Sequence, residues 1–277
     1  MSNIENIISL LSKVREKSPL VHNITNFVVM NNTANALLSI GASPVMAHAQ
    51  EEVEDMVCIA SSLVLNMGTL NSEWVASMIK AGIKAKTKNI PVIFDPVGVG
   101  ATPYRKIMAD KIIEACHPDI IRGNASEIMS LCGQSITTKG VDSTEKTSSA
   151  LQAAKILATK ENCIVVVSGQ VDYITNGIKS VALSNGTEMM SKVTGMGCTS
   201  TAMCGAFAGV VDNIDHSASD DYSLFAAAIA AMSIMGVAGD IATSQSDGPG
   251  SLQVKFLDIL YSINESEIMK RIKYEEI

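Results

Sequence analysis

The sequence predicts an α/β fold, a mostly parallel sheet with helices on both faces and an antiparallel edge. Short apolar segments alternate along the chain with longer segments of helical periodicity, which is typical of strand–helix units. The expected strands are apolar throughout rather than alternating, which indicates that both sheet faces are covered. Two Asn-Gly pairs after residue 170 predict hairpins, and therefore the antiparallel edge.

Composition places the chain among globular proteins with a large core. Its 277 residues are 47% hydrophobic and 18% charged, and we see no repeat, linker or low-complexity segment, so we expect one domain over residues 1–277. The net charge of −7 argues against nucleic acid or an anionic membrane as a partner. The first 17 residues are typical of an amphipathic helix and not of a signal peptide, and the apolar stretches are shorter than a membrane span of about 20 residues. We therefore expect a cytoplasmic protein.

The first half of the chain alternates strand and helix regularly. Strands are expected at 19–25, 43–47, 62–67 and 90–94, and helices at 3–17, 26–40, from 51 onward and at 71–86. In the second of these helices Asn26 is predicted to be the N-cap, and Gly41 is predicted to end it.

The second half continues the alternation and then changes character. Strands are expected at 120–123 and 163–167, hairpins at 172–183 and 181–190, and helices at 143–160, 198–211, 220–242 and after a break at 247–250. The hairpins are centred on Asn176-Gly177 and Asn185-Gly186.

An uncharged stretch over residues 193–209, VTGMGCTSTAMCGAFAG, is the strongest candidate for a functional turn. Gly195 and Gly197 precede an apolar helix, and the first N–H groups of a helix lack internal partners and attract anions. Cys198 would lie on the first helical turn, where a thiolate is stabilised. The alternative is a packed turn before a core helix, with Cys198 as a small buried residue.

Three charged residues are expected at the carboxyl ends of strands, where ligands bind in such sheets. Asp95 begins D-P-V-G-V-G-A-T, which is typical of a residue beside a bound metal or phosphate. The alternative is that Asp95 only caps a turn or a helix. Arg122 at the end of a buried strand needs an anion, either a phosphate or the carboxylate of Asp95 or Glu127. Glu127 follows Asn124 by three residues, as in a capping box, so the alternative for Glu127 is a purely structural role as a helix cap.

The cysteines and histidines give no sign of a disulfide framework or a zinc site. No pair of the six cysteines has C-x-x-C spacing, and the four histidines are scattered and expected to be structural. We expect the cysteines to be reduced, because the chain is acidic and shows no secretion signal.

Seven motifs in order along essentially the whole chain closely resemble the hydroxyethylthiazole kinase family. They are N-I-T-N (23–26), S-P-V-M-A (43–47), D-P-V-G-V-G-A-T (95–102), R-G-N-A-S-E (122–127), S-G-x-V-D (168–172), G-M-G-C (195–198) and G-P-G-S (248–251). The resemblance implies a ribokinase-like three-layer α/β/α sandwich. It also implies ATP-dependent phosphorylation of the alcohol of 4-methyl-5-(2-hydroxyethyl)thiazole with Mg²⁺, and a homotrimer with active sites between subunits.

The resemblance also assigns roles to individual positions. It implies thiazole contacts at Met46 and Gly195 with Asn26 nearby, and ATP contacts at Arg122, Ser168 and Gly197. It implies that Asp95 and Glu127 lie near Mg²⁺ and the phosphates. Cys198 matches the position where the superfamily usually has a catalytic aspartate. Because bound ATP would bring negative charge, we expect no fully formed thiolate at rest, and we expect Cys198 to assist as a weak base. Ser168 replaces the usual threonine, and Leu252 stands where an aromatic residue is common.

Two other functions fit the same fold. One is a nucleotide-dependent dehydratase of the same superfamily that acts on a hydrated nicotinamide cofactor, which would be expected to keep aspartate at position 198. The other is a non-catalytic nucleotide-binding protein, against which the set of Asp95, Arg122, Glu127 and Cys198 argues. An ADP-release assay with the thiazole alcohol would separate these functions.

Overall fold

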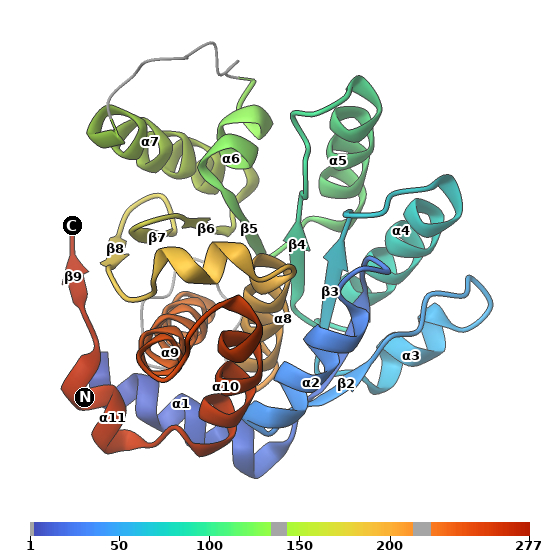
Figure 1. Cartoon of the computed structure of the whole chain (residues 1–277). Coiled ribbons are helices and arrows are strands. Elements are labelled where there is room, and N and C mark those ends of the chain that lie inside the picture. The colour runs from blue at the N-terminus through green and yellow to red at the C-terminus, as the bar shows by residue number, and fades with distance from the viewer. Residues whose placement is uncertain (1–2, 134–142, 213–222) are drawn as a thin grey trace.

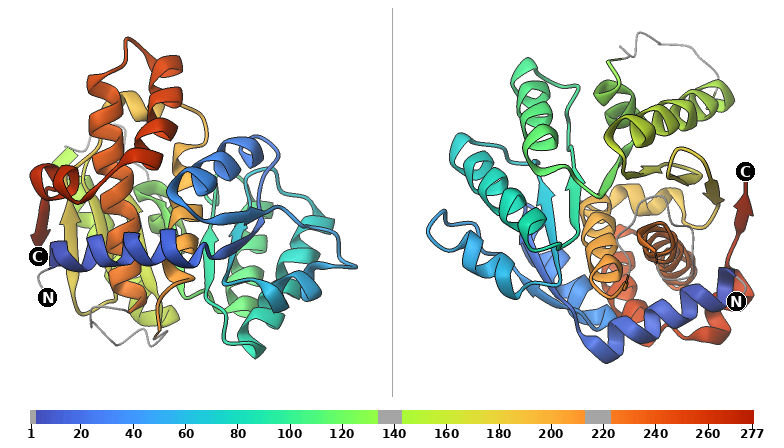
Figure 2. Two further views of the ribbon diagram at one scale, coloured as in Figure 1. Left: turned by 90° about the horizontal axis from the view of Figure 1, so that it is seen from below. Right: turned by 180° about the vertical axis from the view of Figure 1, so that it is seen from behind.

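A nine-stranded sheet runs through the middle of the protein, and helices cover both of its faces (Figure 1, Figure 2). The computed structural model describes residues 3–133, 143–212 and 223–277. The strand order is β2-β1-β3-β4-β5-β6-β7-β8-β9, parallel from β2 to β6 and antiparallel from β6 to β9. The strands are β1 (Leu20–Ile24), β2 (Ser43–Val45), β3 (Ser62–Asn66), β4 (Val92–Asp95), β5 (Ile120–Asn124), β6 (Ile164–Ser168), β7 (Asp172–Thr175), β8 (Ser180–Leu183) and β9 (Tyr274–Glu276).

The helices divide into two layers, each with its own hydrophobic core. One layer holds α3 (Val53–Ile59), α4 (Ser72–Thr87), α5 (Pro103–Cys116), α6 (Ala125–Leu131) and α7 (Ser143–Glu161). The other holds α1 (Asn3–Lys17), α2 (Met30–Ile40), α8 (Met196–Ala208), α9 (Leu224–Ser244), α10 (Pro249–Ser262) and α11 (Glu265–Arg271). The expected three-layer α/β/α arrangement is therefore confirmed (Figure 2).

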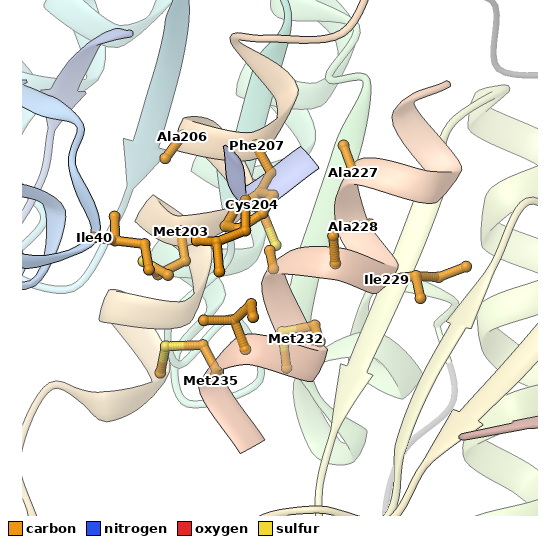
Figure 3. Packing of buried hydrophobic residues seen from close by; sticks show 14 of the residues in the cluster. Ile40, Met203, Cys204, Ala206, Phe207, Ala227, Ala228, Ile229, Met232 and Met235 are labelled. Atoms are coloured by element: carbon orange, nitrogen blue, oxygen red, sulfur yellow. The ribbon is translucent and has the colours of Figure 1, made fainter. Parts of the chain in front are cut away.

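Helices α8 and α9 form the centre of the second layer. Small residues let them approach closely, and Met203, Cys204 and Phe207 of α8 pack toward Met232 and Met235 of α9 (Figure 3). Helix α9 is long and apolar enough to cross a membrane, but 94% of that apolar window is buried inside the protein. Its hydropathy is therefore that of a core helix.

Two predictions need correction, and one helix was missed. Helix α2 begins at Met30 and not at Asn26. The side chain of Asn26 donates to Asn66 Oδ1 of β3 instead of capping the helix. Helix α5 was not predicted, although Thr102 caps it and Pro103 takes its first position, which is a regular start signal.

The second predicted hairpin, around Asn185-Gly186, is also wrong. The Asn185 side chain donates to Asp240 of α9, and residues Glu188–Lys192 form a 3₁₀ helix, η1. The edge of β8 pairs instead with the C-terminal strand β9. The first hairpin, β7–β8, is confirmed.

Candidate functional site

The carboxyl ends of the parallel strands bring polar residues together at one edge of the sheet. Asn66 ends β3, Asp95 ends β4 and Ser168 ends β6, while Arg122 lies in the middle of β5, two residues before its end. Asn66 and Asp95 are register partners, so their side chains meet across adjacent strands. This edge is where ligands bind in open α/β sheets.

Helix α8 points its N-terminus at the same edge. Gly195 caps it with φ of 89°, a left-handed conformation that favours glycine, and its carbonyl accepts from Thr199 N–H at 2.8 Å. At Gly197 a Cβ atom would lie 2.7 Å from Nη1 of Arg122, so the guanidinium rests directly against the helix backbone. Unpaired helix N–H groups and a guanidinium therefore face the same space, which suits an anion.

Asp95 is buried, and only one of its oxygens is bonded. Its Oδ2 accepts from Asn66 Nδ2 at 2.8 Å and from Thr201 Oγ1 at 2.7 Å. Its Oδ1 is buried without a hydrogen-bond partner in the described part of the chain. Burial raises the pKa of Asp95 to about 6, although the positive charge of Arg122 opposes the rise.

Arg122 is buried as well, at 8% exposure, and donates through Nη2 to the hydroxyl of Ser168. Among the described residues its Nε has no acceptor, and it forms no ion pair with Asp95 or Glu127. The salt-bridge alternative from the sequence is therefore wrong. A buried guanidinium with an unused donor is suited to binding an anionic ligand.

Glu127 completes a capping box at the start of α6, as the sequence predicted. Its Oε2 accepts from Asn124 N–H and its Oε1 from Gly98 N–H, both at 2.8 Å, while Asn124 Oδ1 accepts from Glu127 N–H. Glu127 thereby ties the turn after β4 to the start of α6. Each of its oxygens keeps a lone pair for a further partner.

Cys198 lies in the first turn of α8, but its thiol stays protonated at neutral pH. Burial raises the pKa of Cys198 to about 11, and the charge of Asp95 adds to the rise. The amides of Asn66 and Asn26 and the charge of Arg122 oppose the rise but are outweighed. Burial and a nearby carboxylate therefore outweigh the stabilisation of a thiolate by the helix N-terminus.

A cavity of about 650 Å³ opens beside Arg122 and Gly197. Polar residues and thioethers line it together: Arg122, Ser168, Gly169, Gln170, Asp172, Asn185, Gly186, Thr187, Glu188, Met190, Ser191, Met196, Gly197, Ser200, Met232, Met235 and Gly236. Burial raises the pKa of Asp172 to about 6, and its Oδ1 accepts from Gly169 N–H. All three predicted ATP contacts, Arg122, Ser168 and Gly197, line this cavity.

The predicted thiazole contacts are more widely spread. Asn26 is buried and donates to Cys198 Sγ at 3.6 Å. Gly195 caps α8 close to Val29 and Asn32, which belong to the turn and helix after β1. Met46 follows the edge strand β2, whereas Asp95 ends β4. Because β4 is the third strand from β2 in the sheet, roughly 14 Å separates β2 from β4.

Three residues near the site carry no role in the sequence analysis. Asn66 and Thr201 both hold Asp95, and a polar residue closing a buried strand was a usable signal for Asn66. Arg105 donates to the carbonyls of Met67, Gly68 and Val97 at 2.6–2.7 Å, which ties together the turns after β3 and β4. No local pattern marks Arg105, because its acceptors are backbone atoms distant in sequence.

A preformed metal cage is absent from the described residues, where no three His, Cys, Asp or Glu side chains group together. Magnesium differs from zinc in this respect, because it keeps several waters and commonly binds through one or two carboxylates plus substrate phosphates. The unpartnered Oδ1 of Asp95 and the spare lone pairs of Glu127 fit that kind of site.

Comparisons with known proteins agree with the motifs. The sequence model of the hydroxyethylthiazole kinase family matches residues 11–266. The chain belongs to the hydroxyethylthiazole kinase family. The hydroxyethylthiazole kinase of Leptospira biflexa is 50% identical over 269 residues, which are 97% of each chain.

Solved structures confirm the fold of this hydroxyethylthiazole kinase family member. The structure of a hydroxyethylthiazole kinase protein from Pyrococcus horikoshii OT3 matches with a TM-score of 0.88 and 41% identity, covering 99% of both chains. A ribokinase-like superfamily protein from Enterococcus faecalis V583 matches with a TM-score of 0.63 at 11% identity, covering 92% of this chain and 89% of its own. The second likeness shows the fold alone, and the predicted ribokinase-like fold is confirmed.

Proposed function

We propose that this protein transfers the γ-phosphoryl group of ATP to the hydroxyl of 4-methyl-5-(2-hydroxyethyl)thiazole, in thiamine biosynthesis or salvage. The family match over residues 11–266 carries the proposal. The geometry supports it, because phosphoryl transfer depends on positioning and charge stabilisation, and the site offers a guanidinium and helix N–H groups in one place. The dehydratase alternative is disfavoured by the same match.

In this proposal ATP occupies the 650 Å³ cavity with its phosphates toward α8. Arg122, oriented by Ser168, neutralises phosphate charge, and the N–H groups from Gly195 to Cys198 hold the transferred group as its charge shifts. The rest of the nucleotide extends toward the residues beyond Gly169. The cavity's size is in the range of small-molecule and cofactor sites.

Magnesium is the proposed metal, placed by Asp95 and Glu127. Bound there, it would neutralise charge on the phosphate oxygens. Asp95 contributes a carboxylate fixed at Oδ2 with Oδ1 available, and Glu127 contributes a carboxylate fixed by two backbone N–H groups. These hydrogen bonds hold both carboxylates in fixed orientations before any ligand binds, which is preorganisation.

Cys198 is assigned to the acceptor alcohol. Since its thiol is protonated at neutral pH, its role is to hold and orient the hydroxyl and not to store a preformed thiolate. A loose phosphoryl-transfer transition state places little demand on a strong base, so orientation is the larger contribution. Asn26 lies against Cys198 on the side of the turn after β1.

We also propose a cytoplasmic homotrimer with active sites at its interfaces. Phe27 and Val28 are 62% and 65% exposed directly beside Asn26, and Met46 lies toward the edge strand β2. A neighbouring subunit covering this apolar surface would close the thiazole side of the site. Burial of α9 in the core supports a protein without a membrane partner.

A coupled ADP-release assay tests the activity. The thiazole alcohol is offered beside other vitamin alcohols such as a pyrimidine methanol and pyridoxal, with and without Mg²⁺. We expect turnover to be highest with the thiazole alcohol and to require Mg²⁺. Turnover highest with another alcohol would overturn the substrate assignment, and ADP release independent of every alcohol would overturn the transferase assignment.

A further inference from the structure

Asn66 links the two sides of the proposed active site through its side-chain amide. It closes β3 and is 2% exposed. Its Oδ1 accepts from Asn26 Nδ2 at 2.8 Å and from Gly68 N–H at 3.0 Å, and its Nδ2 donates to Asp95 Oδ2 at 2.8 Å. Two donors on the oxygen and an acceptor on the nitrogen fix which way the amide faces.

The first consequence concerns Asp95. Asn66 from β3 and Thr201 from α8 hold the same oxygen, Oδ2, from two different elements. A carboxylate held in this way cannot rotate without breaking two buried hydrogen bonds, each costly to leave unmade. The buried Oδ1 is therefore always presented in the same direction.

The second consequence concerns Cys198. Asn26 receives its orientation from Asn66 and from Val28, whose N–H donates to Asn26 Oδ1 at 3.1 Å. The Asn26 amide then donates to Cys198 Sγ at 3.6 Å. One connected chain of side chains thus runs from Thr201 through Asp95, Asn66 and Asn26 to Cys198.

We propose that Asn66 is a positioning residue for phosphoryl transfer, which fixes Asp95 and, through Asn26, Cys198 in one arrangement. This inference rests on the proposed function. The geometry demands an amide, because the position needs a donor toward Asp95 and an acceptor toward Asn26 at once. Aspartate would place a second carboxylate against Asp95, and leucine would supply neither group.

Steady-state kinetics of Asn66→Leu test the proposal, with ATP and the thiazole alcohol varied separately. We expect kcat to fall about 30-fold while both KM values stay within about threefold, because the substrates still bind but the reacting groups are misplaced. A change in KM with kcat unchanged would overturn the proposal.

A double-mutant cycle with Asp95→Asn separates positioning from a general loss of structure. If Asn66 acts largely through Asp95, adding Asn66→Leu to Asp95→Asn should lower kcat by less than about threefold. An equal loss in both backgrounds would mean that Asn66 does not act through Asp95, and would contradict the proposal. Asn66→Asp keeps the shape and both accepted hydrogen bonds, so it carries the same test if Asn66→Leu fails to fold.

Asn23→Leu is the matched control. Asn23 lies on the neighbouring strand β1 and is also buried, at 1% exposure, but within the described residues its Nδ2 donates to the carbonyl of Val21 alone and its Oδ1 has no partner. We expect Asn23→Leu to keep kcat, and a loss as large as that of Asn66→Leu would overturn a specific role. If wild-type protein does not turn over the thiazole alcohol, the proposed function fails; wild-type turnover with an unaffected Asn66→Leu refutes only this inference.

Discussion

Cys198 is the residue whose chemistry the structure changes most. The sequence places it on a helix N-terminus, which favours a thiolate, but burial and the charge of Asp95 raise its pKa to about 11. Whether a thiol is ionised depends on groups that arrive from other strands, so local position alone cannot decide it. The expectation that no thiolate is fully formed at rest agrees with this pKa.

Cys198→Ala should lower kcat on the order of 10²-fold and leave both KM values nearly unchanged, since it removes orientation of the hydroxyl and not binding. The ADP-release assay measures this directly. Cys204→Ala is the control, because Cys204 lies six residues further along α8, fully buried among apolar side chains (Figure 3). A Cys198→Ala enzyme with wild-type kcat would show that the thiol is only a packing group.

Asp95 should make the ligand-free protein less stable as pH rises. Its pKa is raised from 3.8 to about 6, so between these values the folded carboxyl keeps a proton that the unfolded chain releases. The free energy of unfolding therefore falls through this window and stays lowered above it. Asp95→Asn removes this penalty. The substitution should therefore raise the free energy of unfolding on the order of 1–3 kcal/mol more at pH 7.5 than at pH 4.5.

Urea unfolding of ligand-free protein at both pH values checks this prediction. The comparison between pH values matters, because any packing cost of the substitution is the same at both. Asp110→Asn is the control: Asp110 forms an exposed ion pair with Lys106 and should show nearly equal changes at the two pH values. An Asp95→Asn effect that does not depend on pH would contradict the assigned burial penalty.

At the scale of elements, the parallel part of the fold could be predicted because its signals are local. Continuous apolar runs mark β3, β4 and β6, and capping residues mark α6. The antiparallel edge was harder, since Asn185-Gly186 has hairpin chemistry but its side chain is recruited by Asp240, 55 residues away. A strand such as β9, formed by the last residues of the chain, is set by pairing with β8 and has no strong pattern of its own.

The same division holds for the candidate site. Asp95, Arg122 and Cys198 could be located from strand ends and the glycine turn. The amide chain through Asn66 and the backbone clamp of Arg105 could not, because their partners lie on other elements. The roles proposed for individual site residues, and the single-domain organisation, stay predictions.

The first turn of α8 offers a test of the phosphate site. Gly197→Ala would place a Cβ atom 2.7 Å from Arg122 Nη1, which forces the guanidinium away from the helix. We expect ATP binding to weaken at least about tenfold by calorimetry, or about 1.4 kcal/mol. Gly250→Ala is a matched control, because Gly250 also holds the second position of a helix, α10, and an added Cβ meets nothing within 4 Å. Unchanged ATP affinity in folded Gly197→Ala would argue against phosphate binding there.

At the scale of the whole molecule, the sheet separates two functions along its width. Strands β3 to β6 carry the polar and charged residues of the site, and the 650 Å³ cavity lies beside β5, β6 and α8. Toward the other edge, beyond β1 and β2, the surface beside Asn26 is apolar and exposed. If the proposed function holds, an isolated chain contains the residues for the phosphates but leaves the proposed thiazole side uncovered.

This asymmetry leads to the last prediction, that assembly completes the site. Light scattering should give a trimer of 29.3-kDa chains, about 88 kDa. Val28→Glu should dissociate it, because Val28 is 65% exposed beside Asn26 and a buried unpaired charge is costly. The monomer should lose thiazole turnover while it still binds ATP, whose cavity lies within one chain.

Ile178→Glu is the control for this prediction. Ile178 is 83% exposed in the β7–β8 turn, toward the other side of the sheet, so this variant should stay trimeric and active. A fully active monomer, of wild-type protein or of Val28→Glu, would show that one chain holds the complete site.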